Sequence, residues 1–358
     1  MNIWRWAEHL APIPESARIS LGEGDTPLVR SRRIGPSVGL NNLFLKLETG
    51  NATGSYKDRF AFTAISHMVA MGKTNCVATS SGNTGAALAA YCSAAGIRCR
   101  IAIVEGAPIG KLKQMMAYGA EIVRIRDFGM DAGATQDVFD RLERLGQRDD
   151  SAMQVSAFVY SPEGMSGVQT VAFELAEQTE SSIDHVFCPA GGGGMCVAVA
   201  RGFQRLNATG QLSDIPAVHC VQPHGNDTIA GPLRNGAEHA QDVACTTEVS
   251  GLQVASVVDG HLAVQECRAT GGTGHLVTDE EVWDIQRRLS REEGIFCEPA
   301  GAVALAGAAK AATAGELAPD ATVVCMITGS GFKDPGAVDR MTDDLDCPVL
   351  DADVIDSW

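Results

Sequence analysis

One lysine stands where the sequence changes from turn-forming to helix-forming residues. The segment 46–61 reads KLETGNATGSYKDRFA, and Lys57 follows a run of Gly, Asn, Thr and Ser. A helix amino terminus disfavours a cation. This electrostatic cost lowers the pKa of an amine and suits a lysine that acts as a neutral nucleophile in Schiff-base chemistry. The alternative is an ordinary solvated lysine at the start of a helix.

A second stretch that could do chemistry is PAGGGGMCVAVARG (189–202), in which four consecutive glycines lead into a helical run. Backbone without Cβ atoms lets N–H donors approach a phosphate closely. No G-K-[ST] follows, and G-x-G-x-x-G fails because the third glycine would fall on Cys196 or Val197. No acidic residue stands at the end of a strand about 20 residues on to hold a ribose. We therefore predict a site for one phosphate, as in a small phosphorylated cofactor.

Two further loops offer polar groups at the ends of apolar runs. TSSGNTGAA (79–87) presents hydroxyls, an amide and backbone N–H groups, which suit a carboxylate. Helix capping by one of these residues is the alternative. ITGSGFKDP (327–335) places Thr328 and Ser330 after a strand-like run, and a plain turn is the alternative there.

A nucleophilic lysine, a phosphate loop, a carboxylate loop and a hydroxyl together indicate pyridoxal 5'-phosphate. The cofactor's aldehyde would bond Lys57, its phosphate would lie on the glycine loop, and its ring would serve as the electron sink.

Short apolar runs alternate with helical ones along most of the chain and must position these loops. The expected strands are 75–80, 98–104, 120–125, 185–190, 217–222 and 322–331. Such runs predict parallel sheets covered on both faces, hence three-layer α/β units. A polar break at 144–152 (RLGQRDDSA) separates the first three strands from the others, which predicts two α/β domains. Ligands bind outside the carboxyl ends of such strands.

Composition excludes several classes of protein. The 358 residues are 45% hydrophobic and 20% charged, and the net charge of −16 argues against nucleic acid and against a polybasic membrane anchor. No apolar window is long enough to span a bilayer, and the first residues do not resemble a signal peptide. The eleven cysteines form no C-x-x-C, and the eight histidines show no metal spacing. We expect a cytoplasmic protein without a metal site or a disulfide framework.

The sequence resembles threonine synthase and, more widely, the fold-type II pyridoxal-phosphate enzymes of the tryptophan synthase β family. The matching segments occur in order over most of the chain: LGEGDTPL (21–28), LKLETGNATGSYKDR (45–59), SSGNTG (80–85), GKLKQMMAYGAE (110–121), EGIFCEPAGAVAL (293–305) and TGSGFKDP (328–335).

The resemblance implies roles for individual residues. Lys57 would be the Schiff-base lysine and then the base that takes the Cα proton. Asn83 would hold the cofactor's phenolate oxygen, and Thr328 would face its ring nitrogen. The phosphate would be bound by the backbone of Gly191, Gly192, Gly193, Gly194 and Met195, and the substrate carboxylate by Ser81, Asn83 and Thr84. A hydroxyl at the ring nitrogen favours elimination or replacement over transamination.

One departure puts the substrate in question. In YSPEGMSGVQTVAFE (160–174), threonine synthases carry an arginine that binds the phosphate of O-phosphohomoserine, and this chain has Gly164 there and Ser166 at the family's glutamate position. A glycine cannot pair with a dianion. Lys111 or Lys113 could compensate, and we assign Lys113 to the substrate site. Each could equally be a solvated lysine on a helix face.

The sequence therefore predicts a lyase that removes the Cα proton of a small amino acid and then eliminates or replaces a group at Cβ or Cγ. The substrate would be O-phosphohomoserine, or another such as O-phosphoserine in a cysteate-synthase-like enzyme. A serine/threonine dehydratase, favoured by the all-glycine loop, is the alternative. An NAD-dependent dehydrogenase and a non-catalytic binding protein are more distant alternatives. Residues 46–154 would form the smaller domain, 1–45 and 155–358 the larger, with the site between them in a homodimer.

Overall fold

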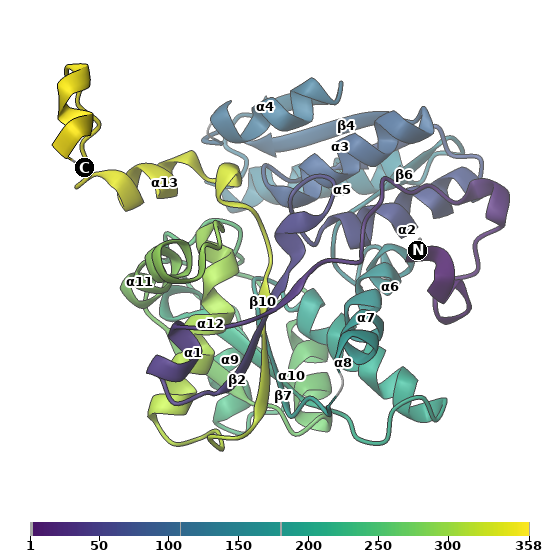
Figure 1. Cartoon of the computed structure of the whole chain (residues 1–358). Helices are drawn as coiled ribbons and strands as arrows, with labels where there is room; N and C mark the ends of the chain where they lie inside the picture. Colours follow the sequence, from purple (N-terminus) through teal and green to yellow (C-terminus); the bar gives the residue numbers. More distant parts are fainter. Residues whose placement is uncertain (1–2, 108, 180, 358) are drawn as a thin grey trace.

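The computed structural model describes residues 3–107, 109–179 and 181–357, and its strands form two separate sheets (Figure 1). The larger sheet has the order β1-β2-β10-β7-β8-β9 and consists of β1 (Leu28–Arg30), β2 (Asn42–Leu47), β10 (Thr322–Ile327), β7 (His185–Pro189), β8 (Ala217–Pro223) and β9 (Gly274–Val277). The smaller has the order β5-β4-β3-β6 and consists of β5 (Glu121–Ile125), β4 (Arg98–Val104), β3 (Asn75–Ala78) and β6 (Ser151–Met153).

Helices cover both faces of each sheet, so the predicted three-layer α/β class is confirmed. Neighbouring residues of the larger sheet's strands point to opposite faces, where α11 (Asp279–Arg288) and α12 (Pro299–Thr313) lie on one side. The other side carries α7 (Thr170–Gln178), α8 (Gly194–Ala208), α9 (Ala230–Arg234) and α10 (Gly260–Ala269). The smaller sheet packs on α2 (Asp58–Ala70) and α3 (Asn83–Ala95) with one face and on α5 (Ala132–Gly146) with the other.

Three features of the sheets differ from the sequence prediction. Strand β1 pairs antiparallel with β2, because the chain returns through a short connection containing α1 (Ile34–Ser37) instead of a long crossover. The edge strand β6 begins at the end of the polar break 144–152 and pairs parallel with β3. Strands β1, β2 and β9 were not predicted. The domain boundaries after residues 45 and 154 stay a prediction.

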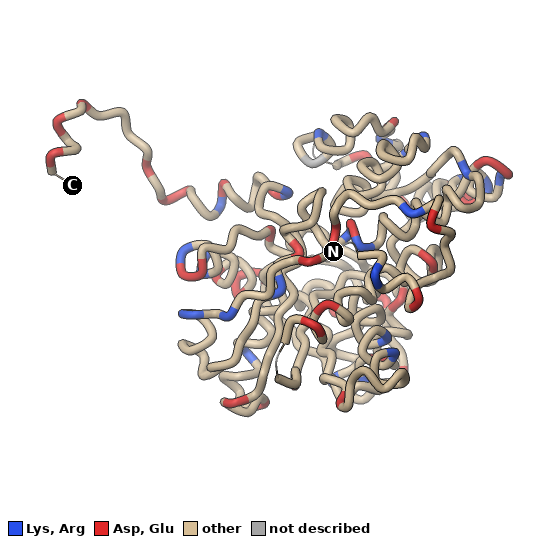
Figure 2. Tube along the Cα trace, turned by 45° about the vertical axis from the view of Figure 1, so that its right-hand side comes forward, with Lys and Arg blue, Asp and Glu red and all other residues tan. Residues whose placement is uncertain are grey.

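The remaining α-helices are α4 (Ile109–Ala117), α6 (Pro162–Ser166) and α13 (Pro335–Thr342). Acidic residues gather on the C-terminal segment 343–357, which extends away from the body of the molecule (Figure 2). Among the described residues, no helix has both the length and the apolar character needed to cross a membrane.

Three histidines form a buried chain across the larger sheet. His185 Nδ1 lies 3.0 Å from His219 Nε2, and His219 Nδ1 lies 3.2 Å from His275 Nε2. Burial lowers the pKa of His219 to about 3 and that of His275 to about 4, and it also lowers the pKa of His185. Glu316 opposes the shift at His275 and Asp184 opposes it at His185, whereas Arg234 reinforces it at His275. The three rings are therefore neutral in the folded protein at neutral pH.

We predict that this chain makes the fold acid-sensitive. Unfolded histidines take up protons below about pH 6.5, whereas His219 and His275 do not until pH 4 or 3. The free energy of unfolding should therefore fall by up to about 1.4 kcal/mol per pH unit for each such histidine below pH 6.5. Urea denaturation between pH 7.5 and 4.5 measures this slope.

Two variants test whether the histidines cause the slope. His219→Leu should make it shallower, while Val218→Ala, a buried neighbour on β8, should lower stability without changing it. Equal slopes in both variants would contradict the assignment.

Candidate active site

A cavity of about 860 Å³ lies where the two sheets face each other, at the carboxyl ends of β3, β7 and β10. Nearly all of the predicted site residues line it together: Lys57, Ser81, Asn83, Thr84, Gly191, Gly192, Gly193, Gly194, Met195 and Thr328. Lys113 is the exception, because it is exposed on α4 and does not line the cavity. The side chain of Lys111 lies outside the described part of the structure.

Lys57 immediately precedes α2, and its side chain reaches into the cavity. Its Nζ donates a hydrogen bond to Ser156 Oγ at 2.7 Å and lies 4.5 Å from the centre of the Tyr56 ring. Loss of hydration lowers the pKa of this amine to about 8, although Asp259 and Glu298 act in the opposite direction. A substantial fraction of the amine is therefore neutral near physiological pH and able to act as a nucleophile.

The four glycines form a tight cradle at the start of α8. Gly193 has φ of +94°, and a Cβ on it would lie 2.8 Å from the Cβ of Ala263. A Cβ on Gly191 would lie 3.0 Å from Val254, so the loop 250–258 leaves no room for side chains. Bare backbone at a helix amino terminus is a site for a phosphate, and these residues fit the phosphate of a pyridoxal cofactor.

Crowding at this cradle gives a testable prediction. Gly193→Ala should destabilise the holoenzyme by about 1–3 kcal/mol, because the new methyl group meets buried atoms, and it should weaken cofactor binding. Gly210→Ala, just past the other end of α8, is a matched control: its φ is +74° but nothing lies within 4 Å. Thermal unfolding and cofactor titration measure both effects. Equal cofactor affinities in the two variants would contradict the prediction.

Three further polar groups converge beside Lys57. Asn83, the first residue of α3, donates from Nδ2 to Glu298 Oε1 at 2.7 Å. The backbone N–H of Glu298 in turn donates to Gly329 O at 3.0 Å. Thr328 is buried at the end of β10, and its carbonyl accepts from Tyr56 N at 3.0 Å. The sequence analysis gave no role to Glu298 or Ser156: Glu298 belongs to the quoted segment EGIFCEPAGAVAL but was not assigned to the site, and Ser156 belongs to no local pattern that indicates contact with it.

Gly164 lies away from the cavity, in the contact between α6 and α2. A Cβ at this position would lie 2.5 Å from Phe60 Cε2 and 2.9 Å from Ala64 Cβ. Its carbonyl accepts a hydrogen bond from Thr63 Oγ1 at 2.8 Å. An arginine could not be accommodated here without moving α6, so the departure from the family pattern has a steric basis.

Two cationic side chains that the sequence analysis did not select line the cavity. Lys333 donates from Nζ to Gln114 Oε1 at 2.8 Å, and burial lowers its pKa. Arg340 lies over the Trp283 ring at 4.2 Å, and 3.8 Å separates its guanidinium from the Glu248 carboxylate. Lys333 belongs to the quoted segment TGSGFKDP, so the signal was present but was not assigned to the substrate.

Comparison with solved structures gives the class of protein first. The chain superposes on threonine deaminase isoform 2 of Solanum lycopersicum with a TM-score of 0.76 and 21% identity, covering 95% of this chain and 87% of that one. Maize serine racemase matches with a TM-score of 0.74 and 24% identity, covering 89% and 92%. The fold is that of the fold-type II pyridoxal-phosphate enzymes.

Sequence comparison then gives the family. A family model described as pyridoxal-phosphate dependent enzyme matches residues 19–329. Threonine synthase of Methanocaldococcus jannaschii is 32% identical over 96% of this chain and 84% of that protein. Threonine synthase of Halalkalibacterium halodurans is 30% identical over 99% and 96%. The chain belongs to the pyridoxal-phosphate dependent enzyme family and is a threonine-synthase-like, pyridoxal-phosphate-dependent lyase.

Proposed function

We propose that the enzyme removes the Cα proton of a phosphorylated small amino acid and expels its phosphate, with O-phosphohomoserine as the first candidate substrate. The observation that carries this proposal is Lys333, a partly buried cation that lines the same cavity as Lys57. The carboxylates of Glu298 and Asp58 act on this ammonium, and from the cavity wall it can also bind an anionic substituent of a substrate. The relatives named threonine synthase support the proposal, because their name gives threonine as the product.

The residues at the cavity divide between holding the cofactor and acting on the substrate. The backbone of 191–195 and the side chains of Asn83 and Thr328 would hold pyridoxal phosphate, which supplies an electron sink when bound. Lys57 Nζ would take the Cα proton, because its lowered pKa of about 8 makes it a suitable base near neutral pH. Ser81, Asn83 and Thr84, at the amino end of α3, would bind the substrate carboxylate.

The leaving phosphate would be bound by Lys333. Gln114 Oε1 fixes the position of the Lys333 ammonium at 2.8 Å, and Gln114 Nε2 donates to Thr53 O at 3.1 Å. This arrangement connects α4 of the smaller sheet to the loop after β10. A point charge held in this way can replace the missing arginine at Gly164, although without the bidentate geometry of a guanidinium.

A serine/threonine dehydratase is the second candidate, because its substrate needs no cation for a leaving phosphate. The all-glycine loop and Gly164 favour it. Lys333 argues against it.

Assays on the purified holoenzyme distinguish the two functions. We expect phosphate and threonine from O-phosphohomoserine. Lys333→Ala should raise KM for that substrate by about tenfold or more, as loss of a charged contact does. Lys113→Ala is the matched control and should change little, since Lys113 is exposed outside the cavity. Keto acid from threonine or serine, with O-phosphohomoserine and O-phosphoserine inert, would instead make the enzyme a dehydratase.

The resemblance to fold-type II enzymes also supports a homodimer located in the cytoplasm. Light scattering on the purified protein tests the dimer, and a monomer at assay concentration would contradict it.

A further inference from the structure

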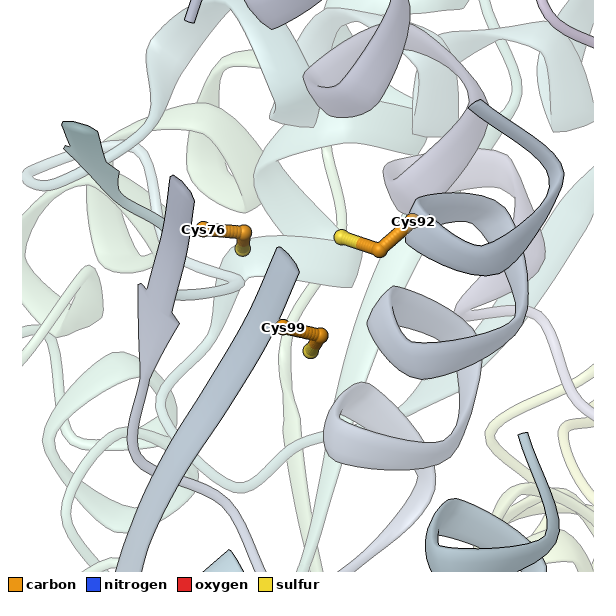
Figure 3. Close-up of side chains that lie close together, drawn as sticks. All are labelled: Cys76, Cys92 and Cys99. Atoms are coloured by element: carbon orange, nitrogen blue, oxygen red, sulfur yellow. The ribbon is translucent and has the colours of Figure 1, made fainter. Parts of the chain in front are cut away.

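Three cysteine side chains from three different elements meet beside the smaller sheet (Figure 3). Cys76 lies on β3, Cys99 on β4 and Cys92 on α3, and their sulfur atoms are all within 4.8 Å of one another. Cys76 and Cys99 are register partners on adjacent parallel strands, and both side chains point toward the helix that carries Cys92. Within the described residues, no other group of three His, Cys, Asp or Glu side chains comes as close together.

Buried cysteines often serve as small apolar core residues. What distinguishes these three cysteines is the short distance between their sulfur atoms. Three thiolates bound at about 2.3 Å to one shared pyramidal centre lie about 3.5 Å from each other. That separation falls within the observed limit of 4.8 Å. The three sulfur atoms can therefore reach one ion with small side-chain adjustments and no change in strand register.

The surroundings decide which kind of ion these three sulfurs suit. Cys76 and Cys92 are 0% exposed and Cys99 is 5% exposed, within an apolar cluster that includes Ala78 and Ile101. An uncompensated charge is costly in such a place. Three thiolates around a monovalent or divalent cation leave a net negative charge, whereas three thiolates around a trivalent centre are neutral. A three-coordinate centre also needs no water as a fourth ligand.

We propose that Cys76, Cys92 and Cys99 form a binding site for a trivalent, thiophilic centre, of which arsenite is the simplest source. The reaction As(OH)₃ + 3 Cys–SH → As(S–Cys)₃ + 3 H₂O balances without an oxidant or a reductant. Three As–O bonds break, three As–S bonds form, and each thiol proton leaves with a hydroxide as water.

The site is separate from the active-site cavity. It lies near the amino ends of β3 and β4, while the cavity lies at the carboxyl ends of the strands. The exposed turn at Gly96, between α3 and β4, lies three residues before Cys99 in the sequence. Arsenite bound here would stabilise the β3–α3–β4 unit without competing for the cofactor.

Arsenite titration of the reduced holoenzyme tests the proposal. Native mass spectrometry should show one arsenic atom gained and three hydrogen atoms lost, and X-ray absorption should show three As–S bonds. Cys92→Ala should remove this signature and weaken binding by about tenfold or more, as loss of metal-site groups does. Cys196→Ala, at a buried cysteine on α8, and Cys347→Ser, at an exposed cysteine, are matched controls that should bind normally.

Several outcomes would overturn the proposal. The folded wild-type protein could bind no arsenic, Cys92→Ala could retain three As–S bonds, or Cys347→Ser could lose arsenic binding. Far-UV circular dichroism and the visible absorption of the cofactor report whether each variant is folded and loaded. If Cys92→Ala does not fold, Cys92→Ser and Cys99→Ala provide the same test with different packing.

Discussion

Replacing Lys57 with alanine is expected to abolish the visible absorption of the bound cofactor, which makes the purified enzyme yellow. It should also lower the activity by more than about a thousandfold, while the fold is retained. The amine of Lys57 is assigned two tasks, bonding the cofactor and moving the Cα proton, and no neighbouring side chain can take over both. Visible absorption after exhaustive dialysis measures the first task and product formation the second. Lys333→Ala is the control: it should keep the absorption and lose substrate affinity.

The pH dependence of cofactor capture adds an independent readout. Only the neutral amine attacks an aldehyde, and the pKa of Lys57 is lowered to about 8 by its surroundings. The rate at which apoenzyme takes up pyridoxal phosphate should therefore rise with pH and level off above about pH 8. Lys57→Arg keeps a positive charge but cannot form the bond, so it should remain colourless at every pH. A yellow Lys57→Ala or Lys57→Arg protein would refute the assignment.

Site features defined by neighbouring residues could be predicted from the sequence. Lys57 and the glycine loop each carry their signal within a dozen residues, because a helix start and a phosphate loop are local structures. The strand 98–104 and the start of the strand predicted for 322–331 could be predicted for the same reason, since runs rich in apolar residues need no knowledge of their neighbours; the second strand ends at Ile327, earlier than predicted.

Features that depend on contacts between distant segments could not be predicted. The partner of Lys57 is Ser156, 99 residues away, and the partner of Asn83 is Glu298, 215 residues away. The assignment of Lys113 to the substrate site relied on its position in a matching segment, yet helix periodicity places that side chain in solvent. Lys333, a cation that does line the cavity, follows a different strand.

The most consequential of these unpredicted contacts is a buried ion network two residues after Lys57. Arg59 is 0% exposed and donates to both carboxylate oxygens of Glu48, at 2.7 and 2.8 Å. It also pairs with Glu174 on α7, while Lys46 Nζ lies 3.4 Å from the same carboxylate. Two positive and two negative charges thus compensate each other and join β2, α2 and α7. Burial alone would raise the pKa of Glu48, but Arg59 lowers it below its ordinary value.

Removing one member of this network should destabilise the protein more than any surface change. Arg59→Ala leaves two buried carboxylates facing Lys46 alone, which should cost about 3–5 kcal/mol of unfolding free energy. It should also weaken cofactor binding, because Arg59 anchors the first turn of α2, which begins directly after Lys57. Arg141→Ala, which breaks the exposed pair with Asp137, is the control and should leave stability unchanged.

The dependence of stability on pH provides a second test of the same ion network. Since the folded pKa of Glu48 is lowered, its stabilising contribution is present at neutral pH and is lost as the pH falls below the ordinary carboxyl range. In Glu48→Gln this part of the acid dependence should disappear, and stability at neutral pH should already be low because the charge of Arg59 is then only partly compensated. Urea denaturation of both proteins from pH 7 to 3 measures the difference. A Glu48→Gln protein as stable as wild type at pH 7 would mean that hydrogen bonding, and not charge, holds the start of α2 in place.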